Sequence, residues 1–259
     1  MRFRMKKQIK YMSYNPFSLE GKTVLVTGAS SGIGKATAIL CSKLGASVII
    51  TARNEERLKD TVSQLEGNNN KIVVADLSGT EGINQLINEV NELDGLVNNA
   101  GINKILPIQF VDEHELMNTM QINALSPILL TQGLIKKKRI RKGGAIVFVS
   151  SIAGHTRSSV GNSMYCASKG TITGFMKCIS KELVIKKIRC NEVLPGQVDT
   201  PIMSQGAVTE EQMTALAAHI PMKRLGNPEE IAAGIVFLLS DAASYITGSS
   251  LIIDGGLSL

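Results

Sequence analysis

From residue 22 to residue 256, short runs of Val, Ile and Leu alternate with stretches of helical spacing. The apolar runs lie at 22–27, 46–51, 71–75, 93–98, 144–150, 188–194 and 250–256. Such runs predict strands that are buried on both faces, as in a parallel sheet. Helical periodicity lies between them, at 32–45, 54–67, 80–91, about 112–137, about 163–186 and about 228–240. The alternation predicts an α/β fold, a doubly wound parallel sheet of about seven strands with helices on both faces.

The length of 259 residues suits one sheet of this kind. The sequence contains no repeat, no low-complexity segment and no interdomain linker, so residues 21–259 are expected to form a single domain. Residues 1–20 are polar and aperiodic, and we expect a basic, flexible leader there. Met12 is an alternative start to Met1, because the segment that follows it runs directly into the first strand.

Composition excludes several classes of protein. The formal net charge is +6, but the first ten residues hold five Lys and Arg, so the basic balance does not indicate a nucleic-acid binder. No run of 18 apolar residues exists, which argues against a membrane span. No apolar segment follows the basic start, which argues against a secretory signal. Four cysteines without CxxC spacing favour the cytoplasm, and three histidines without ligand spacing predict no metal site.

A glycine-rich turn, TGASSGIG at 27–34, joins the first strand to the first helix. Gly28 allows a tight turn off the strand, Gly32 allows close approach of a pyrophosphate, and Gly34 allows the helix to pack close to the sheet. The helix N-terminus then offers free N–H groups to phosphates. The position of the turn in the first strand–helix unit favours a dinucleotide site over an ordinary tight turn.

Tyr165 and Lys169 are four residues apart in a predicted helix, so their side chains share one face. An ordinary Tyr has a pKa of about 10, and a nearby ammonium is expected to lower it and make the phenol useful for proton transfer. Ser151 follows a predicted strand, at the sheet edge where such folds bind ligands. Its hydroxyl could bind a substrate oxygen. Without Ser151, the spacing of Tyr165 and Lys169 would equally suit an ordinary helix that carries a surface Lys.

Five motifs, taken together, resemble the short-chain dehydrogenase/reductase family. They are TGASSGIG, NNAG at 98–101, Ser151 with Gly154, YCASK at 165–169 and LPGQVDT at 194–200, and the resemblance runs from Lys22 to Gly256. It implies a Rossmann fold and an NAD(P)(H)-dependent oxidoreductase that transfers hydride between nicotinamide and a carbonyl or secondary alcohol. The 3-oxoacyl-[acyl-carrier-protein] reductases share this general style of sequence, as do sugar, polyol and hydroxysteroid dehydrogenases.

The resemblance also assigns site residues. It makes Asn123, Ser151, Tyr165 and Lys169 the catalytic set, with Asn123 bending its helix and holding a water that links Lys169 to solvent. Asp76 would accept from the adenine amino group. The cofactor-binding set is Gly28, Ser30, Ser31, Gly32, Ile33, Gly34, Arg53, Asp76, Leu77, Asn99, Ala100, Gly101, Tyr165, Lys169, Pro195, Gly196, Val198 and Thr200. The resemblance further implies a homodimer or homotetramer that pairs through the helices at 112–137 and 163–186.

The end of the second strand bears on the choice of cofactor. An NAD-binding chain places Asp or Glu there, whereas this chain has Ala52 followed by Arg53, which suits the 2′-phosphate of NADP. Ser31 stands where a second basic residue is usual before the middle glycine. We therefore expect NADP(H) to be preferred over NAD(H).

The substrate side is less defined. Residues 201–222 predict either a lid or a core-facing short helix, with an apolar face made by Ile202, Met203, Val208, Met213 and Leu216. His155, Arg157 and Asn162 could meet a polar or anionic group. KKKRIRK at 136–142 places six positive charges at a predicted helix end, either as a solvated face or as a docking patch for an acidic acyl carrier protein.

The sequence thus favours a ketone reductase of the 3-oxoacyl-thioester type that acts on a small-molecule carbonyl or alcohol. Another dehydrogenase of the same family, for a sugar, a polyol or a hydroxysteroid, stays open. A catalytically silent NADP-binding sensor or scaffold is the alternative from another class.

Overall fold

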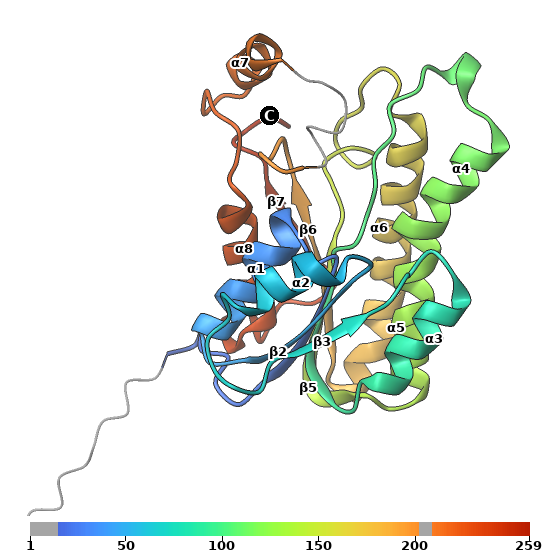
Figure 1. The fold of residues 1–259 in the computed structure, drawn as a ribbon. Helices are drawn as coiled ribbons and strands as arrows, with labels where there is room; N and C mark the ends of the chain where they lie inside the picture. Colours follow the sequence, from blue (N-terminus) through green and yellow to red (C-terminus); the bar gives the residue numbers. More distant parts are fainter. Residues whose placement is uncertain (1–14, 202–208) are drawn as a thin grey trace, which may run out of the picture.

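The computed structural model describes residues 15–201 and 209–259, and within them one sheet of seven strands lies between two layers of helices (Figure 1). All strand pairings are parallel, in the order β3-β2-β1-β4-β5-β6-β7. The strands are β1 Thr23–Thr27, β2 Ser47–Ala52, β3 Lys71–Val74, β4 Leu93–Asn98, β5 Ile140–Val149, β6 Arg189–Pro195 and β7 Ser250–Ile253. The predicted fold class is confirmed.

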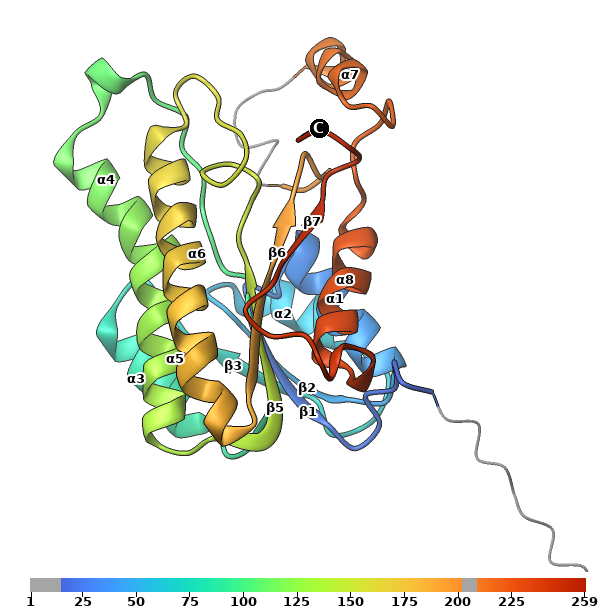
Figure 2. The ribbon, with the colours of Figure 1, turned by 180° about the vertical axis from the view of Figure 1, so that it is seen from behind.

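Helices cover both faces of the sheet (Figures 1 and 2). The α-helices are α1 Gly32–Lys43, α2 Glu55–Val62, α3 Thr80–Glu89, α4 Glu113–Met120, α5 Ser126–Lys136, α6 Ser163–Leu183, α7 Glu210–His219 and α8 Pro228–Leu239. α1, α2 and α8 pack on one face, and α3, α5 and α6 pack on the other. No helix in the described residues is both long enough and apolar enough to cross a membrane.

Each face of the sheet has its own apolar core. Val26 of β1 belongs to the core under α1 and α8, whereas its neighbour Leu25 belongs to the core under α3, α5 and α6. Successive side chains of a strand point to opposite faces, so a strand that is covered on both sides is apolar at most positions. This requirement explains the unbroken Val, Ile and Leu runs of the sequence.

The order of the strands determines where a ligand can bind. The chain builds outward from β1 to β3 and then returns to β4 on the other side of β1, so the direction of winding reverses between β1 and β4. Ligands of such sheets lie in the crevice beyond the carboxyl ends of the strands at this reversal. The glycine turn follows β1, Asn99 follows β4 and Ser151 lies two residues after the end of β5.

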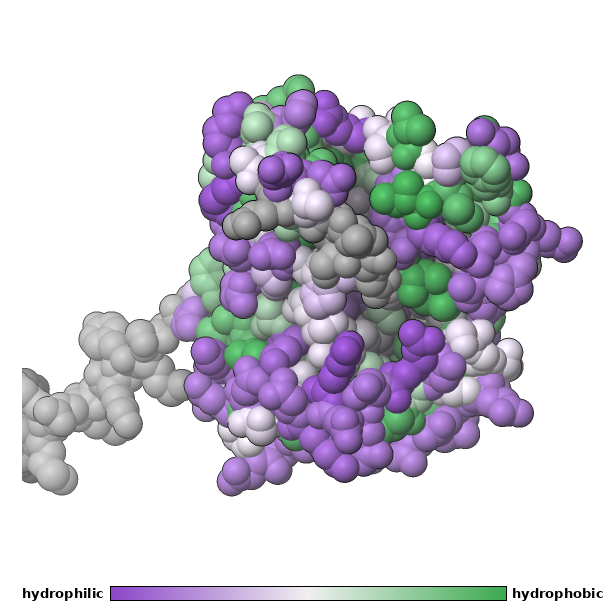
Figure 3. Space-filling view, turned by 45° about the horizontal axis from the view of Figure 1, so that its top comes forward, coloured by the Kyte–Doolittle hydropathy of each residue, from purple (hydrophilic) through white to green (hydrophobic). Residues whose placement is uncertain are grey.

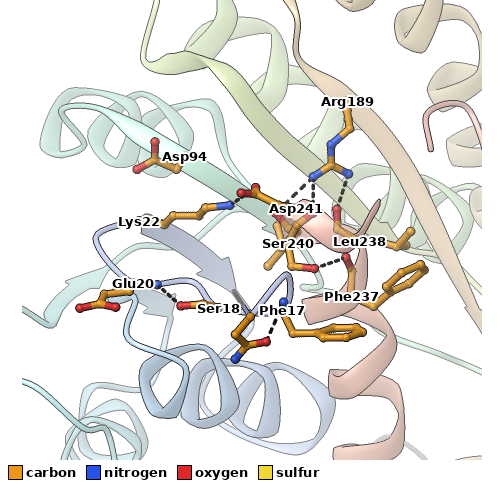
Figure 4. Close-up of polar contacts among 12 residues, drawn as sticks. Phe17, Ser18, Glu20, Lys22, Asp94, Arg189, Phe237, Leu238, Ser240 and Asp241 are labelled. Atoms are coloured by element: carbon orange, nitrogen blue, oxygen red, sulfur yellow. Dashed lines mark hydrogen bonds and ion pairs between the residues drawn. The ribbon is translucent and has the colours of Figure 1, made fainter. Parts of the chain in front are cut away.

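Residues 15–20, which were expected to belong to the leader, pack against the domain. Leu19 is fully buried in the core under α1 and α8, and the ring of Phe17 lies 6.3 Å from that of Phe237 on α8. Lys22 forms an ion pair of 2.6 Å with Asp241, just beyond α8 (Figure 4). The packed domain therefore includes residues 15–20, because Leu19 supplies apolar area to its core. Residues 1–14 lie outside the described residues.

Arg189, at the start of β6, binds the C-terminal end of α8 (Figure 4). Its guanidinium donates to the carbonyl oxygens of Leu238 at 2.6 Å, Leu239 at 3.2 Å and Ser240 at 3.0 Å. The last carbonyls of a helix have no partner within the helix, and the helix dipole favours a cation at this end. Arg189 thus ties α8 to the sheet.

Several predicted elements differ from the structure. The helix expected at 54–67 ends at Val62, and the strand expected at 250–256 ends at Ile253. The helix expected at 112–137 consists of α4 and α5 joined by a π-helix, Gln121–Leu125. The strand expected at 144–150 begins earlier, at Ile140. The basic run KKKRIRK, which was expected at a helix end, therefore extends from the last residue of α5 into β5. Arg141 on β5 pairs with Glu92 at 2.9 Å and Asp94 at 3.0 Å, so part of this basic run is neutralised.

Candidate active site

The glycine turn after β1 is held by close packing. Gly28 has φ +65°, a conformation that residues with a Cβ rarely adopt. A Cβ on Gly34 would lie 2.4 Å from both the Asn99 Nδ2 atom and the Gly28 carbonyl oxygen. Asn99 Nδ2 donates to the carbonyl oxygen of Thr27 at 2.9 Å, which fixes the turn to the end of β4. Only glycine therefore lets α1 start this close to the sheet.

A cavity of about 280 Å³, here called the turn cavity, lies over this turn. It contains twelve of the residues predicted to bind a cofactor, together with Arg57 and Ile102, which the sequence analysis missed. The predicted members are Gly28, Ser30, Ser31, Gly32, Ile33, Arg53, Asp76, Leu77, Asn99, Ala100, Gly101 and Thr200. Gly34 lies beneath the turn and does not line the cavity.

One side of the turn cavity is positively charged. Arg53 follows β2, and Arg57 lies on the first turn of α2, where its backbone N–H donates to the side chain of the N-cap Asn54 at 2.9 Å. Asp76 brings a negative charge to the same cavity. The Ser78 backbone N–H and, more weakly, Arg53 hold the pKa of its carboxyl below the usual value. Arg57 lies four residues after Arg53, and this spacing in the sequence could have identified it.

A second cavity of about 490 Å³, here called the Tyr165 cavity, lies beyond the ends of β5 and β6. Ser151, Tyr165 and Lys169 line it together with the predicted cofactor residues Pro195, Gly196, Val198 and Thr200. The two cavities share four lining residues, Ile33, Asn99, Gly101 and Thr200. They therefore form one continuous groove along the carboxyl edge of the sheet.

Three side chains meet at the Tyr165 cavity. Tyr165 lies in the first turn of α6, and Lys169 lies one turn later with its side chain buried. Lys169 Nζ donates to the Val149 carbonyl oxygen at 2.8 Å and lies 5.6 Å from the centroid of the Tyr165 ring. The Ser151 oxygen accepts from the Ala153 backbone N–H at 3.1 Å, and the Ser151 hydroxyl lies near enough to the Tyr165 phenol to influence its pKa. Two hydroxyls and a buried amine thus share one wall.

The electrostatics of this wall differ from the expectation. Burial raises the pKa of Tyr165 to about 12, although the nearby Ser151 hydroxyl opposes this rise. Burial also lowers the pKa of Lys169 to about 8, against the opposing effect of Glu192. The predicted lowering of the Tyr165 pKa by Lys169 is wrong for the protein alone, because desolvation dominates and the ammonium is directed at a carbonyl oxygen. The phenol is therefore neutral at physiological pH and suited to donate a proton.

Asn123 lies in the π-helix and lines neither cavity. Its Oδ1 atom accepts from the Ile102 backbone N–H at 2.8 Å, and its Nδ2 atom donates to the Ile102 carbonyl oxygen at 2.8 Å and to the Ser168 hydroxyl at 3.1 Å. The π-helix provides the predicted irregularity, and the side chain holds the backbone that follows Gly101. The proposed water relay to Lys169 stays a prediction.

The profile of a protein family described as enoyl-(acyl carrier protein) reductase matches residues 28–258. The chain belongs to the short-chain dehydrogenase/reductase family. It is 36% identical over 244 residues to the 3-oxoacyl-[acyl-carrier-protein] reductase FabG of Vibrio cholerae, covering 93% of this chain and 98% of that protein. It is 39% identical over 240 residues to the FabG of Rickettsia prowazekii, covering 92% of this chain and 98% of that protein.

Solved structures of the short-chain dehydrogenase/reductase type superpose closely. The RhlG/NADP active-site complex of Pseudomonas aeruginosa is 32% identical with a TM-score of 0.88, covering 95% of this chain and 100% of that chain. A dehydrogenase/reductase of Sinorhizobium meliloti is 32% identical with a TM-score of 0.87, covering 94% and 98%. The predicted family is confirmed, and the protein is an oxidoreductase.

The short-chain dehydrogenase/reductase site has further members on its substrate side. Arg157 and Asn162 line the Tyr165 cavity as predicted, whereas His155 does not. Leu216 and His219 of α7 line it as well, which places α7 at the cavity mouth. Ile202, Met203 and Val208 of the expected lid lie outside the described residues. Leu257, near the chain end, also lines the cavity, and nothing in the sequence pattern indicated it.

Proposed function

We propose that this protein reduces 3-oxoacyl thioesters with NADPH. The observation that carries the proposal is that the hydroxyls of Ser151 and Tyr165 line one cavity together with Lys169, and that this cavity is continuous with the glycine turn. A carbonyl oxygen placed at this pair could receive two hydrogen bonds at once. The curated relatives named 3-oxoacyl-[acyl-carrier-protein] reductase support this substrate class.

The groove fits a dinucleotide. α1 begins without a side-chain cap from Ser31, so its first N–H groups are available, and the glycines keep the turn free of Cβ atoms. Gly28, Ser30, Gly32 and Arg53 would hold the adenosine and phosphate end, while the wall formed by Tyr165 and Lys169 would meet the other end. When bound, the reduced nicotinamide supplies the hydride.

Tyr165 is the proposed acid. With its pKa at about 12 it carries its proton at neutral pH and can pass it to the carbonyl oxygen as negative charge develops there. Ser151 donates a hydrogen bond to the same oxygen and so stabilises that charge. Lys169, whose pKa is about 8, is largely an ammonium at pH 7 and stabilises the phenolate that remains.

A preference for NADPH is proposed from the charge of the turn cavity. Arg53 and Arg57 both line it, and Ala52 stands where an acid would repel a 2′-phosphate. The test is the Kd of NADPH and of NADH measured by fluorescence titration. Arg53→Ala should weaken NADPH binding about 10-fold or more and leave NADH unchanged. Lys59→Ala is the matched control, because Lys59 lies on α2 outside the cavity. Tighter binding of NADH by the wild type would contradict the preference.

An acyl chain is proposed to leave the Tyr165 cavity through an adjoining groove of about 330 Å³. The groove shares Ser158 and Ser159 with the Tyr165 cavity and is lined by Ile108 and Val160, which are largely exposed. Apolar side chains gather on this face around the start of α4 (Figure 3). An apolar tail would bury this surface, whereas a free sugar would not.

The substrate class is tested by initial rates with NADPH against acetoacetyl and 3-oxodecanoyl thioesters, a ketosteroid and a keto-sugar. We expect the highest kcat/KM for the longer thioester, and Val160→Asp should lower it about 10-fold without affecting the shorter one. Ile185→Asp changes a similarly exposed apolar residue that does not line this groove, and it serves as control. Preference for the keto-sugar would favour the polyol alternative, and NADPH binding without any turnover would favour a sensor.

We further propose that the protein forms a homodimer or homotetramer through α5 and α6. Leu129 of α5 and Leu125, the last residue of the π-helix before it, are exposed apolar residues, with exposures of 42% and 36%. Light scattering of the wild type and of Leu129→Glu would test it, since a charge at such an interface should yield monomers. Delivery of the acyl group by an acidic acyl carrier protein and a cytoplasmic location stay predictions.

A further inference from the structure

Two charged side chains are buried in the part of the chain that the structure describes. Of all the Asp, Glu, Lys and Arg residues that the structure describes, Lys169 and Glu192 are the two in the buried set, with exposures of 5% and 0%. Burial of a lone charge is strongly unfavourable, so buried charges are normally compensated by an opposite charge and by hydrogen bonds. The proposed reaction uses Lys169 and assigns no role to Glu192.

Glu192 lies on β6, between the sheet and α6. Its Oε2 atom accepts from the Thr173 hydroxyl at 3.0 Å, and its Oε1 atom accepts from the Ser250 hydroxyl at 2.7 Å. Both oxygens act as acceptors, which is the pattern of an ionised carboxylate. Thr173 lies one helical turn after Lys169 on α6, so the carboxylate is anchored directly beside the segment that carries the amine.

We infer that Glu192 is a positioning residue whose carboxylate keeps Lys169 a cation beside Tyr165. The inference rests on the proposed reduction, in which Lys169 acts as an ammonium. Desolvation favours the neutral amine, and the negative charge of Glu192 acts against it. Without that charge, the amine would lose its proton at a lower pH than it does now.

The other groups near this pair do not replace the carboxylate. Lys169 Nζ faces the Tyr165 ring on its own helix and the neutral Val149 carbonyl at the end of β5. The Gly101 segment and the Asn123 amide on the π-helix are likewise neutral. Beside Glu192, Cys190 is buried, and this raises the pKa of its thiol, which stays neutral. Lys177 of α6 donates to the Gly248 carbonyl oxygen at 2.8 Å instead of to Glu192.

The test is the pH profile of kcat/KM for NADPH-dependent reduction of a 3-oxoacyl thioester. In the wild type, the rate should fall as pH rises through about 8, where Lys169 loses its proton. Glu192→Gln keeps the shape of the side chain but removes its charge. This fall should move to lower pH, because loss of an opposite charge lowers the pKa of an amine. Activity at pH 7.5 should drop several-fold and recover near pH 6.

Thr173→Val is the matched control, since it removes one hydrogen bond to Glu192 and leaves the charge. It should lower Tm without moving the pH profile. Glu192→Met, an apolar side chain of similar length, should shift the profile in the same direction as Gln and provides a second variant if Gln folds poorly. An unmoved profile in a folded Glu192 variant, or an equal loss of rate at every pH, would overturn the inference. An inactive wild type would instead contradict the proposed reaction.

Discussion

Replacing Asn123 with Ala removes three hydrogen bonds from the interior. Two of them satisfy the N–H and the carbonyl of Ile102, at 2.8 Å each, and the third reaches Ser168 at 3.1 Å. An unsatisfied buried polar group costs about 1–3 kcal/mol, and because Ile102 is only partly buried we take about 1 kcal/mol for each of its two groups. With the Ser168 contact, the free energy of unfolding should fall by about 2–3 kcal/mol.

For a domain of this size that loss lowers Tm by about 5–10 °C, measured by circular dichroism. Ile102 also lines the turn cavity, so the affinity for NADPH should fall with it. Asn88→Ala is the control, because the exposed Asn88 side chain accepts only from the exposed Lys137, and Tm should change by about 1 °C or less. A Tm for Asn123→Ala that matches this control would show that the contacts with Ile102 do not stabilise the fold.

Other substitutions give separate expectations. Tyr165→Phe should fold and bind NADPH while turnover falls about 100-fold or more, and unchanged turnover would exclude Tyr165 as the acid. Gly28→Val should abolish NADPH binding in a titration, because its Cβ would lie 2.8 Å from the Ala100 Cα atom. Arg189→Ala should lower Tm by several degrees, since three carbonyls at the end of α8 lose their donor. Folding lowers the pKa of Lys169 from 10.5 to about 8, so the unfolded chain binds more protons between these values. The free energy of unfolding, measured with urea, should therefore rise as the pH increases from 8 to 10, and Lys169→Met should lack this rise.

Much of the fold was predictable from the sequence because the apolar runs indicate both where a strand lies and that its two faces are buried. A strand covered on both faces is mostly apolar, so runs such as 46–51 mark buried parallel strands without further information. The glycine turn was predictable because Gly28 and Gly34 meet backbone at distances that no Cβ allows. The placement of Ser151 at the cavity followed from the carboxyl edge of the sheet, whereas the family resemblance placed Tyr165 beside it.

Other features depend on three-dimensional packing and leave little local signal. The pKa of Tyr165 is raised because the assembled domain desolvates the phenol, and the i, i+4 spacing to Lys169 gives no measure of that burial. The hydrogen bonds of Asn123 with Ile102 join residues that are 21 positions apart, which the local sequence does not indicate. Glu192 could not be located beside α6 until β6 and α6 were placed together.

The packing of residues 15–20 has a practical consequence for anyone producing this enzyme. A shortened version cut at residue 21, where the apolar pattern begins, would discard the fully buried Leu19 and uncover Phe237. An affinity tag or fusion partner should therefore be joined ahead of residue 15, so that Phe17 and Leu19 still pack against the domain.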